Sequence, residues 1–425
     1  MIADLSYTVP TDITTESVQE MDTYVARQPI FDTRRRISGY ELLFRDQTAR
    51  YNPDIEGDVA TSTVLSNSYF SIGMDSLVGS KKSFINFTQS LLLQKFPLLL
   101  PRESTVIEIL ENVQPTPDLI ESCRDMAQQG YSFALDDFTY APELQPLIDL
   151  AKIIKFDFRL TSLEKIEEYL HKIQSREDLI LLAEKIETHD EFQRASEMGF
   201  NLFQGYFFCK PELVTGKEIP GSQLALLQIM AEVNRPEFDI RKIEILIAPD
   251  VSLAYKLLRY INSAFFAKAQ PISSIQQALV YMGEQEIRRF VSLVAMSNLA
   301  KGKPGELIRS ACIRGKFCEL LGTELSPAAK PSELFTLGMF SLIDAILDQP
   351  MLKVMQALPL ADDIKMALTE RKGRLIGYLL LAETYERGRW EQMTKVARVM
   401  KIPENKLPEF YLQACKWSNT FTDSN

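Results

Sequence analysis

Residues 24–44 read YVARQPIFDTRRRISGYELLF, and this stretch is the starting point for the prediction of the fold. It contains two apolar runs, Tyr24–Phe31 and Gly39–Phe44, which are separated only by residues 32–38. Such a gap is too short for the crossover helix that parallel strands need. We therefore expect these two runs to form an antiparallel hairpin.

Similar short apolar runs recur downstream, and most gaps between them leave room for one helix. The further predicted strands are Phe84–Phe87, Val106–Leu110, Ser132–Asp136, Ile153–Asp157, Leu179–Ala183 and Asn201–Gln204. Two intervening helices are well delimited, one from about Asp58 to Gly73 and one from Pro117 to Gly130. With the hairpin, the pattern predicts an α/β region built as a (β/α)8 TIM-like barrel with an antiparallel first strand.

After Lys210-Pro211 the apolar spacing becomes helical. Ile287, Phe290, Val291 and Val294 form one apolar stripe. The predicted helices are Pro249–Ile261, Ser274–Gly283, Glu306–Leu321, Ser332–Asp348, Arg374–Arg387 and Trp390–Met400. The predicted organisation is a disordered acidic tail (1–23), a barrel (24–212), a linker (213–222), an all-α domain (223–405) and a C-terminal segment (406–425) with a frayed tail from Asn419.

Composition excludes several classes of protein. The chain has 425 residues but only two histidines, which excludes a site built on three imidazoles. Its net charge is −10 and its one basic cluster is Arg34-Arg35-Arg36, so we expect no nucleic-acid partner. No apolar run reaches the roughly 18 residues that span a bilayer. We therefore expect no membrane partner. Five scattered cysteines without a CxxC motif indicate reduced thiols, and hence a cytoplasmic protein.

Polar residues lie at the ends of the predicted strands, where barrels of this type keep their active sites. They are Glu108, Asp136, Lys155, Asp157, Glu184 and Gln204. Any one of them can be a solvated strand end or half of an ion pair, but six on consecutive strands favour a site. Asp136-Asp137 with Glu41, Asn86 and Glu108 is an all-oxygen set suited to Mg²⁺ or Mn²⁺. Such metals suit phosphodiester hydrolysis.

Seven ordered motifs over about Tyr24–Pro211 resemble the EAL domain, the cyclic-di-GMP phosphodiesterase family, whose fold is a (β/α)8 barrel with an antiparallel first strand. The motifs are Gln28-Pro29-Ile30 with Gly39–Arg45, Ile85-Asn86, Glu108–Glu111, Leu135–Phe138, Lys155-Phe156-Asp157, Ala183–Glu187 and Gln204-Gly205-Tyr206. The resemblance implies hydrolysis of cyclic-di-GMP to linear pGpG with Mg²⁺ or Mn²⁺. It also implies a possible homodimer, because such barrels often pair.

The resemblance assigns a role to each matching residue. Metal binding is implied for Glu41, Asn86, Glu108, Asp136 and Asp137. Catalytic roles are implied for Lys155, Glu184, Glu187 and Gln204, with Lys155 orienting water or stabilising charge and Glu184 binding metal or activating water. Substrate binding is implied for Gln28, Arg45 and Asp157, with Arg45 on a phosphate. Glu111 would steady the loop after the paired aspartates.

The chain departs from the family pattern at three places. The loop that usually reads DDFGTGYSS reads DDFTYAP at Asp136–Pro142, Leu42 replaces the central alanine of the EAL triplet, and Lys185 replaces a glycine. Backbone freedom that glycine supplies is thereby lost. Two alternatives to an active enzyme therefore stay open: a catalytically silent barrel that senses the nucleotide, and a protein-interaction scaffold.

The helical region is similar to the HDOD domain, an HD-hydrolase fold without its metal ligands. The matching segments are Ile247–Leu253, Leu257–Ala264, Ile275–Leu279 and Met282-Gly283. Both histidines, His171 and His189, precede this region, so a histidine-based HD centre is excluded. The resemblance implies a non-catalytic regulatory module that binds an unknown protein partner. Phe410, Tyr411, Trp390 and Trp417 could anchor an interface or pack in the core.

Overall fold

A computed structural model describes residues 23–46, 77–173, 176, 178–210, 233, 257–258, 260–262, 272, 274–299, 303–325, 329–358 and 360–422. The predicted N-terminal tail, the predicted helix from Asp58 to Gly73 and the predicted linker lie outside these residues, as does most of the predicted helix Pro249–Ile261. Within the described part of the chain, no helix is long and apolar enough to cross a membrane.

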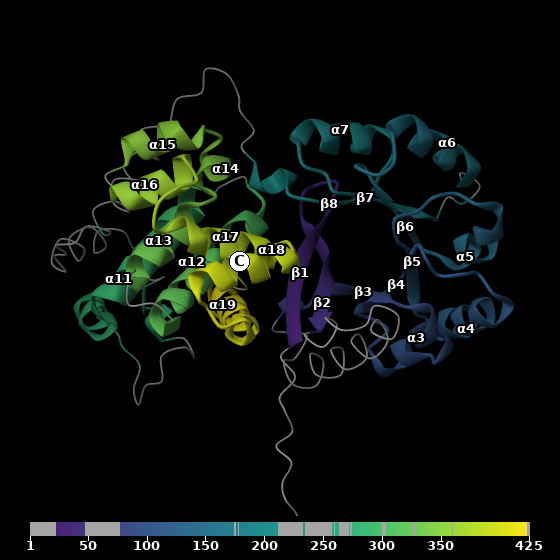
Figure 1. The fold of residues 1–425 in the computed structure, drawn as a ribbon, viewed down its shortest axis with the longest axis horizontal. Coiled ribbons are helices and arrows are strands. Elements are labelled where there is room, and N and C mark those ends of the chain that lie inside the picture. The colour runs from purple at the N-terminus through teal and green to yellow at the C-terminus, as the bar shows by residue number, and fades with distance from the viewer. Residues whose placement is uncertain are drawn as a thin grey trace, which may run out of the picture.

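The first region is a closed eight-stranded barrel, as predicted, with the strands in sequential order around it (Figure 1). The strands are β1 (Thr23–Asp32), β2 (Ile37–Asp46), β3 (Lys82–Phe87), β4 (Thr105–Ile109), β5 (Ser132–Leu135), β6 (Ile153–Asp157), β7 (Ile180–Glu184) and β8 (Leu202–Gln204). β1 runs antiparallel to both β2 and β8, while all other neighbours pair in parallel. The predicted hairpin is confirmed.

The turn of that hairpin explains the basic cluster. The Asp32 carboxylate accepts hydrogen bonds from the backbone N–H groups of Arg34 and Arg36 and pairs with the Arg36 guanidinium at 2.7 Å. Arg35 takes the left-handed conformation, with φ 59°. The three arginines are therefore part of a tight turn that one aspartate organises.

Helices and short 3-10 turns connect the parallel strands on the outside of the barrel. They are α3 (Gln89–Leu93), η3 (Phe96–Leu99), α4 (Pro117–Gln128), η4 (Pro142–Leu144), α5 (Gln145–Leu150), α6 (Leu163–Ile173), α7 (His189–Glu197) and η5 (Phe207–Cys209). Local sequence sets their starts. The Thr116 side chain accepts from the N–H of Leu119 before α4, and Thr188 and Glu191 form a reciprocal capping box on α7.

The second region is helical, as predicted. Its elements are α11 (Ile275–Leu299), α12 (Gly305–Leu325), α13 (Pro331–Phe340), α14 (Ile343–Leu347), α15 (Met351–Ala357), α16 (Asp362–Thr369), α17 (Ile376–Glu386), α18 (Trp390–Met400), η6 (Glu404–Lys406) and α19 (Leu407–Thr422). The range of α11 holds two helices that meet at Gly283, where φ is 69° and ψ is 171°, so the first of them ends at Gly283, as predicted.

Two predictions for this region were wrong. The single helix predicted over 332–348 is split into α13 and α14, because the Ser341 hydroxyl donates to the Gly338 carbonyl and accepts from Arg314, which competes with helix continuation. Residues 419–422 of the predicted frayed tail belong instead to α19, which runs to Thr422, and residues 423–425 lie outside the described part of the chain. Tyr411 and Trp417 are buried on that helix, so they are packing residues.

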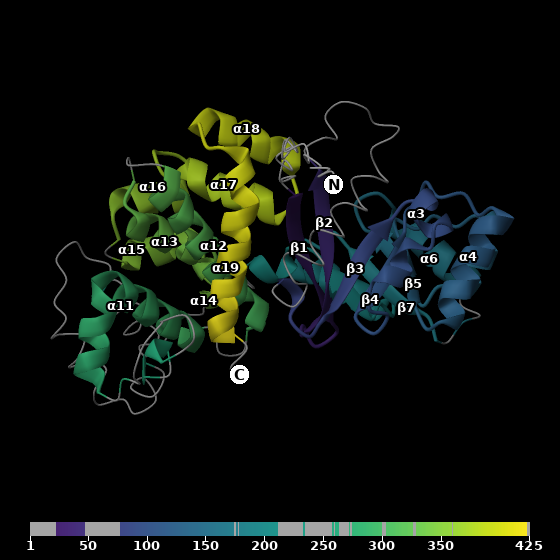
Figure 2. The ribbon, with the colours of Figure 1, turned by 90° about the horizontal axis from the view of Figure 1, so that it is seen from below.

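β1 is the contact between the two regions. It lies between the rest of the barrel and the helices α17, α18 and α19 in both views (Figures 1 and 2). The Tyr24 ring packs against Tyr385 and Trp390, with centroids 6.3 and 5.9 Å away. One continuous apolar cluster consequently joins the outer layer of the barrel to the core of α12, α13 and α17–α19.

Replacing Gly338 by alanine tests the close contact of α12 with α13. A Cβ at Gly338 would overlap the Arg314 carbonyl oxygen and lie 2.7 Å from the Gly315 Cα. We expect Gly338→Ala to lower the free energy of unfolding by about 1–3 kcal/mol, because backbone atoms cannot move aside. Gly305→Ala, whose Cβ would meet no atom within 4 Å, should change it by less than about 0.5 kcal/mol. Denaturant unfolding of both variants measures this, and equal stabilities would contradict the packing.

Candidate active site

All eight strands place one polar side chain at the same rim of the barrel. These residues are Gln28, Glu41, Asn86, Glu108, Asp136, Lys155, Glu184 and Gln204. Seven of them lie two residues from a member of the apolar layer inside the barrel, which consists of Ile30, Phe84, Val106, Ala134, Ile153, Leu182 and Leu202. Side chains two apart on a strand share a face, so β3 to β8 each supply first the floor and then the site, and the antiparallel β1 supplies them in the reverse order.

Lys155 lies at the centre of this rim and its side chain is fully buried. Its Nζ is 2.6 Å from Glu108, 2.7 Å from Asp136, 2.7 Å from Glu184 and 3.9 Å from Glu41. With Asp137 these four residues form what we call the acidic cluster: Glu41, Glu108, Asp136, Asp137 and Glu184. Four carboxylates thus surround the Lys155 ammonium, and the fifth, Asp137, lies beside Asp136 and Glu184, which leaves an excess of negative charge in a buried place.

The buried charges shift one another's pKa values. Burial disfavours the Lys155 ammonium, but Glu108, Glu184 and the other carboxylates outweigh it and hold the pKa of Lys155 well above its usual range. Burial raises the pKa of Glu108 well above its usual range and that of Glu184 to about 8, although Lys155 opposes both shifts. The site is therefore short of positive charge.

Amide side chains orient Glu41 from two sides. Asn86 Nδ2 donates to Glu41 Oε1 at 3.1 Å, and Gln204 Nε2 donates to Glu41 Oε2. The same Gln204 nitrogen donates to Gln28 Oε1 at 3.0 Å. The predicted site residues on β1, β2, β3 and β8 are thereby brought together as one hydrogen-bonded group.

The acidic cluster fits a divalent cation. Ligand oxygens of Asp136, Asp137 and Glu184 all lie within 4.8 Å of one another. Asn86 Oδ1 and Asp137 Oδ1 are buried and accept no hydrogen bond within the described residues. Buried polar atoms without a partner are costly, so these orphaned oxygens favour an ion as their missing partner. Carboxylate and amide oxygens are the donors that Mg²⁺ and Mn²⁺ prefer.

The loop after the paired aspartates contains no glycine and is held by other contacts. Asp137 itself takes the left-handed region, with φ 40°, which aspartate tolerates better than most residues. The Phe138 N–H donates to the Lys155 carbonyl at 2.9 Å, and the buried Phe138 ring packs on Phe156 and Tyr169. Hydrophobic anchoring and one backbone hydrogen bond thus hold the loop beside the site.

Lys185 explains a second departure from the family pattern. Its backbone has φ 55°, so it keeps the left-handed conformation that a glycine would adopt there. Its ammonium pairs with the buried carboxylate of Asp157. Sequence reasoning missed this pair, and the only signal for it was a lysine at a glycine position.

The remaining predicted residues lie elsewhere. The Asp157 carboxylate also accepts from the N–H groups of Arg159 (2.6 Å) and Leu160 (3.1 Å), so it organises the turn after β6, and its predicted role in substrate binding stays a prediction. Glu187 is half exposed and pairs with Lys210 at 3.5 Å, away from the acidic cluster. Its predicted catalytic role is not supported by this placement, because the strand has ended and its side chain turns outward.

For two further predicted residues, Glu111 and Arg45, the structure shows no side-chain contact with the acidic cluster within the described residues. Glu111 is exposed in the turn after β4, yet its charge contributes, after burial and Asp136, to raising the pKa of Asp137. Arg45 lies in β2 opposite Tyr24, and its side chain falls outside the described part of the structure. Their predicted roles stay predictions.

Family models match both regions of the chain. The model of the EAL domain matches residues 66–211, and the model of the HDOD domain matches residues 219–361. Cyclic di-GMP phosphodiesterase CdgJ of Vibrio cholerae is 38% identical over 398 residues, which cover 93% of this chain and 92% of that protein. The uncharacterized protein YuxH of Bacillus subtilis is 34% identical over 413 residues, which cover 95% of this chain and 100% of that protein.

Solved structures of EAL proteins also match. A standalone EAL protein from Vibrio cholerae in its c-di-GMP-bound form is 25% identical, with a TM-score of 0.35, over 45% of this chain and 92% of that chain. A manganese and cyclic-di-GMP complex of Klebsiella pneumoniae BlrP1 is 19% identical, with a TM-score of 0.38, over 45% of this chain and 56% of that chain.

Removing the central ammonium tests the electrostatics of the rim. In the presence of a chelator, we expect Lys155→Met to destabilise the protein by about 3–5 kcal/mol, because the acidic cluster loses its buried counter-charge. Mn²⁺ should restore part of the loss. Lys172→Met, which removes an exposed ion pair with Glu168, should leave the stability close to that of the parent, because water screens this pair. Thermal unfolding with EDTA or Mn²⁺ measures both, and a Lys155→Met protein as stable as the parent in EDTA would refute the interpretation.

Proposed function

The chain belongs to the family of EAL–HDOD proteins that includes CdgJ of Vibrio cholerae, and from this premise we propose that its barrel hydrolyses cyclic di-GMP to linear pGpG in a metal-dependent reaction. The helical domain, which belongs to a class without histidine ligands, serves as the regulatory part. The reaction adds one water across one phosphodiester: the water oxygen bonds to phosphorus and the bond from phosphorus to the 3′ oxygen breaks.

One observation carries the proposal. The acidic cluster gathers at one rim with Lys155 in its centre, and Asp136, Asp137 and Glu184 converge within 4.8 Å. A surplus of carboxylate around a buried centre repels an anionic substrate unless cations neutralise it. Such an arrangement suits a phosphodiester only together with metal ions, and we propose Mg²⁺ or Mn²⁺ for this role.

Each group at the rim then has a defined task. Glu41, Asn86, Glu108, Asp136 and Asp137 would hold the metal, which when bound supplies charge neutralisation and activation of water. Lys155 keeps three carboxylates at hydrogen-bonding distance and so preserves their arrangement. Glu184 is the proposed acceptor of the water proton, and the departing 3′ oxygen takes up one proton in turn.

A second function competes with hydrolysis. The loop after Asp137 lacks glycines, and Phe138 is locked by its hydrogen bond to Lys155 and by its buried ring. If catalysis requires this loop to move, the barrel binds cyclic di-GMP without cleaving it and acts as a sensor through the helical domain. A cytoplasmic location, a protein partner of the helical domain and a homodimer are further parts of the proposal.

Product analysis separates these functions. We expect the full-length protein to convert cyclic di-GMP to pGpG with Mn²⁺ or Mg²⁺ and not with EDTA, and Glu184→Gln to lower kcat by about 10²–10⁴-fold, because the proton acceptor is lost. Glu121→Gln, on the exposed face of α4, is the matched control and should stay within about twofold of the parent.

The remaining outcomes decide between the alternatives. If no pGpG forms with either metal, the enzyme proposal fails. Binding of cyclic di-GMP with Ca²⁺ and no turnover would then support the sensor, and absence of binding would support the scaffold.

A further inference from the structure

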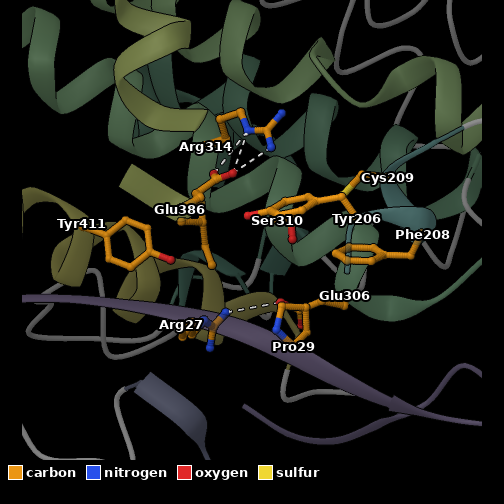
Figure 3. Close-up of a pocket in the computed structure, with 11 residues that line it drawn as sticks. Arg27, Pro29, Tyr206, Phe208, Cys209, Glu306, Ser310, Arg314, Glu386 and Tyr411 are labelled. Atoms are coloured by element: carbon orange, nitrogen blue, oxygen red, sulfur yellow. Dashed lines mark hydrogen bonds and ion pairs between the residues drawn. The ribbon is translucent and has the colours of Figure 1, made fainter. Parts of the chain in front are cut away.

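The helical domain touches the two strands that carry Gln28 and Glu41. Neighbouring residues on these strands point to opposite faces. Arg27 pairs with Glu306 of α12 at 3.7 Å, and the Tyr40 hydroxyl donates to the same carboxylate at 2.8 Å. Figure 3 shows this interface, where the Arg27–Glu306 pair on the β1 side lies opposite the Arg314–Glu386 pair of the helical domain. Each strand thus has one residue in the interface and the next one at the active-site rim.

A chain of hydrogen bonds connects the helical domain to Glu41 itself. Gln28 Nε2 donates to the backbone carbonyl of Arg387 at 3.3 Å. Gln28 Oε1 accepts from Gln204 Nε2 at 3.0 Å, and Gln204 Nε2 donates onward to Glu41. Arg387 immediately follows α17, so only two side chains, Gln28 and Gln204, lie between a turn of the helical domain and a proposed metal ligand.

We call this chain of hydrogen bonds, from the Arg387 carbonyl through Gln28 and Gln204 to Glu41, the relay. The chemistry of its two end groups determines which atoms of the two glutamines donate and which accept. A backbone carbonyl and a carboxylate only accept hydrogen bonds. The atom of Gln28 that faces Arg387 must therefore be its NH₂ group, which leaves the Gln28 oxygen for Gln204. Gln204 in turn must present its NH₂ group to both Gln28 and Glu41. If the Arg387 carbonyl moved away, the Gln28 amide would be free to rotate. Its NH₂ group could then face the NH₂ group of Gln204, and two donors form no hydrogen bond.

The turn that supplies the carbonyl is pressed against the barrel. The Arg387 guanidinium lies 4.5 Å above the centroid of the Tyr206 ring, which follows Gln204 by two residues. Gly388 has φ 62°, and a Cβ there would lie 2.5 Å from Leu43 Cδ1 on β2. Trp390 packs on Tyr24 of β1. The position of the Arg387–Gly388 turn therefore follows the docking of the helical domain.

We propose that the Arg387–Gly388 turn of the helical domain positions the metal-binding carboxylate Glu41 through Gln28 and Gln204, so that docking of this domain sets the metal affinity of the barrel. Gln28 and the turn are positioning groups in this proposal, which rests on the proposed metal-dependent function. Groups that orient a metal ligand through hydrogen bonds change metal affinity by about 10–100-fold when they are removed. A helical domain that shifts by one hydrogen-bond length would thereby alter the active site without contacting substrate.

Titration of the metal-free full-length protein with Mn²⁺ alone tests the relay. We expect Gln28→Leu to weaken Mn²⁺ binding by about tenfold. Gly388→Ala should weaken it by about three- to tenfold, because alanine is strained at φ 62° and its Cβ would also overlap Leu43 Cδ1, so that the turn shifts. In the double variant, Gly388→Ala should add nothing to the effect of Gln28→Leu, because both act through one path. If Gly388→Ala folds poorly, Trp390→Leu replaces it, because it loosens the turn from Tyr24 without inserting an atom. It should also weaken Mn²⁺ binding and add nothing to the effect of Gln28→Leu.

Gly373→Ala is the matched control. It places alanine at another left-handed position of the helical domain, with φ 91°, where the added Cβ meets only Met366. Its Mn²⁺ affinity should equal that of the parent. Parent-like affinity in Gly388→Ala and Trp390→Leu, additive losses in the double variant, or a parent that binds no Mn²⁺ would overturn the relay.

The relay and the proposed function fail separately. If the parent forms no pGpG while the variants show the expected loss of Mn²⁺ affinity, the hydrolase proposal falls and the relay stands. If the parent forms pGpG and all variants keep its Mn²⁺ affinity, the relay falls and the hydrolase stands.

Discussion

The buried ammonium of Lys155 is the interaction on which the barrel rim depends. Carboxylates from β2, β4, β7 and the end of β5 converge on it, and without a cation they would repel one another in a place shielded from water. The ammonium holds them at a spacing that metal ions can also satisfy. Burial, with a further contribution from neighbouring carboxylates, raises the pKa of Glu108 and Glu184. The excess of carboxylate over ammonium is what makes the rim receptive to divalent cations.

Strands β1 and β2 serve two structures at once. Their alternation gives Gln28 and Glu41 to the rim, while Arg27 and Tyr40 contact Glu306 of the helical domain. Because the apolar cluster of the outer barrel continues into the helical core, the two regions are packed as closely as parts of one domain. A change in the helical region therefore has a short physical path to Glu41.

The period of two along each strand made most of the site predictable. It places Val106 and Glu108, or Ile153 and Lys155, on one face, so the strands and the rim residues followed from the spacing of apolar positions. The contacts of side chains at and just beyond the strand ends do not follow from this period. Asp157 and Glu187 fit the family motif, but local turns direct Asp157 to backbone N–H groups and Lys185, and Glu187 to the surface. The split at Ser341 was likewise invisible, because it depends on Arg314 from another helix.

By itself, the sequence determined the eight-stranded barrel with its antiparallel first strand, the helical character of the second region, the absence of a histidine-based centre and the identity of the carboxylate set. These depend on local periodicity and on residue chemistry, which a linear pattern records. Only the tertiary structure decided that Lys155 occupies the centre of the acidic cluster, that Lys185 neutralises Asp157, and that the Arg387 carbonyl reaches Gln28. These contacts join residues far apart in the chain, and the last involves a backbone atom, which every residue carries and no sequence pattern marks.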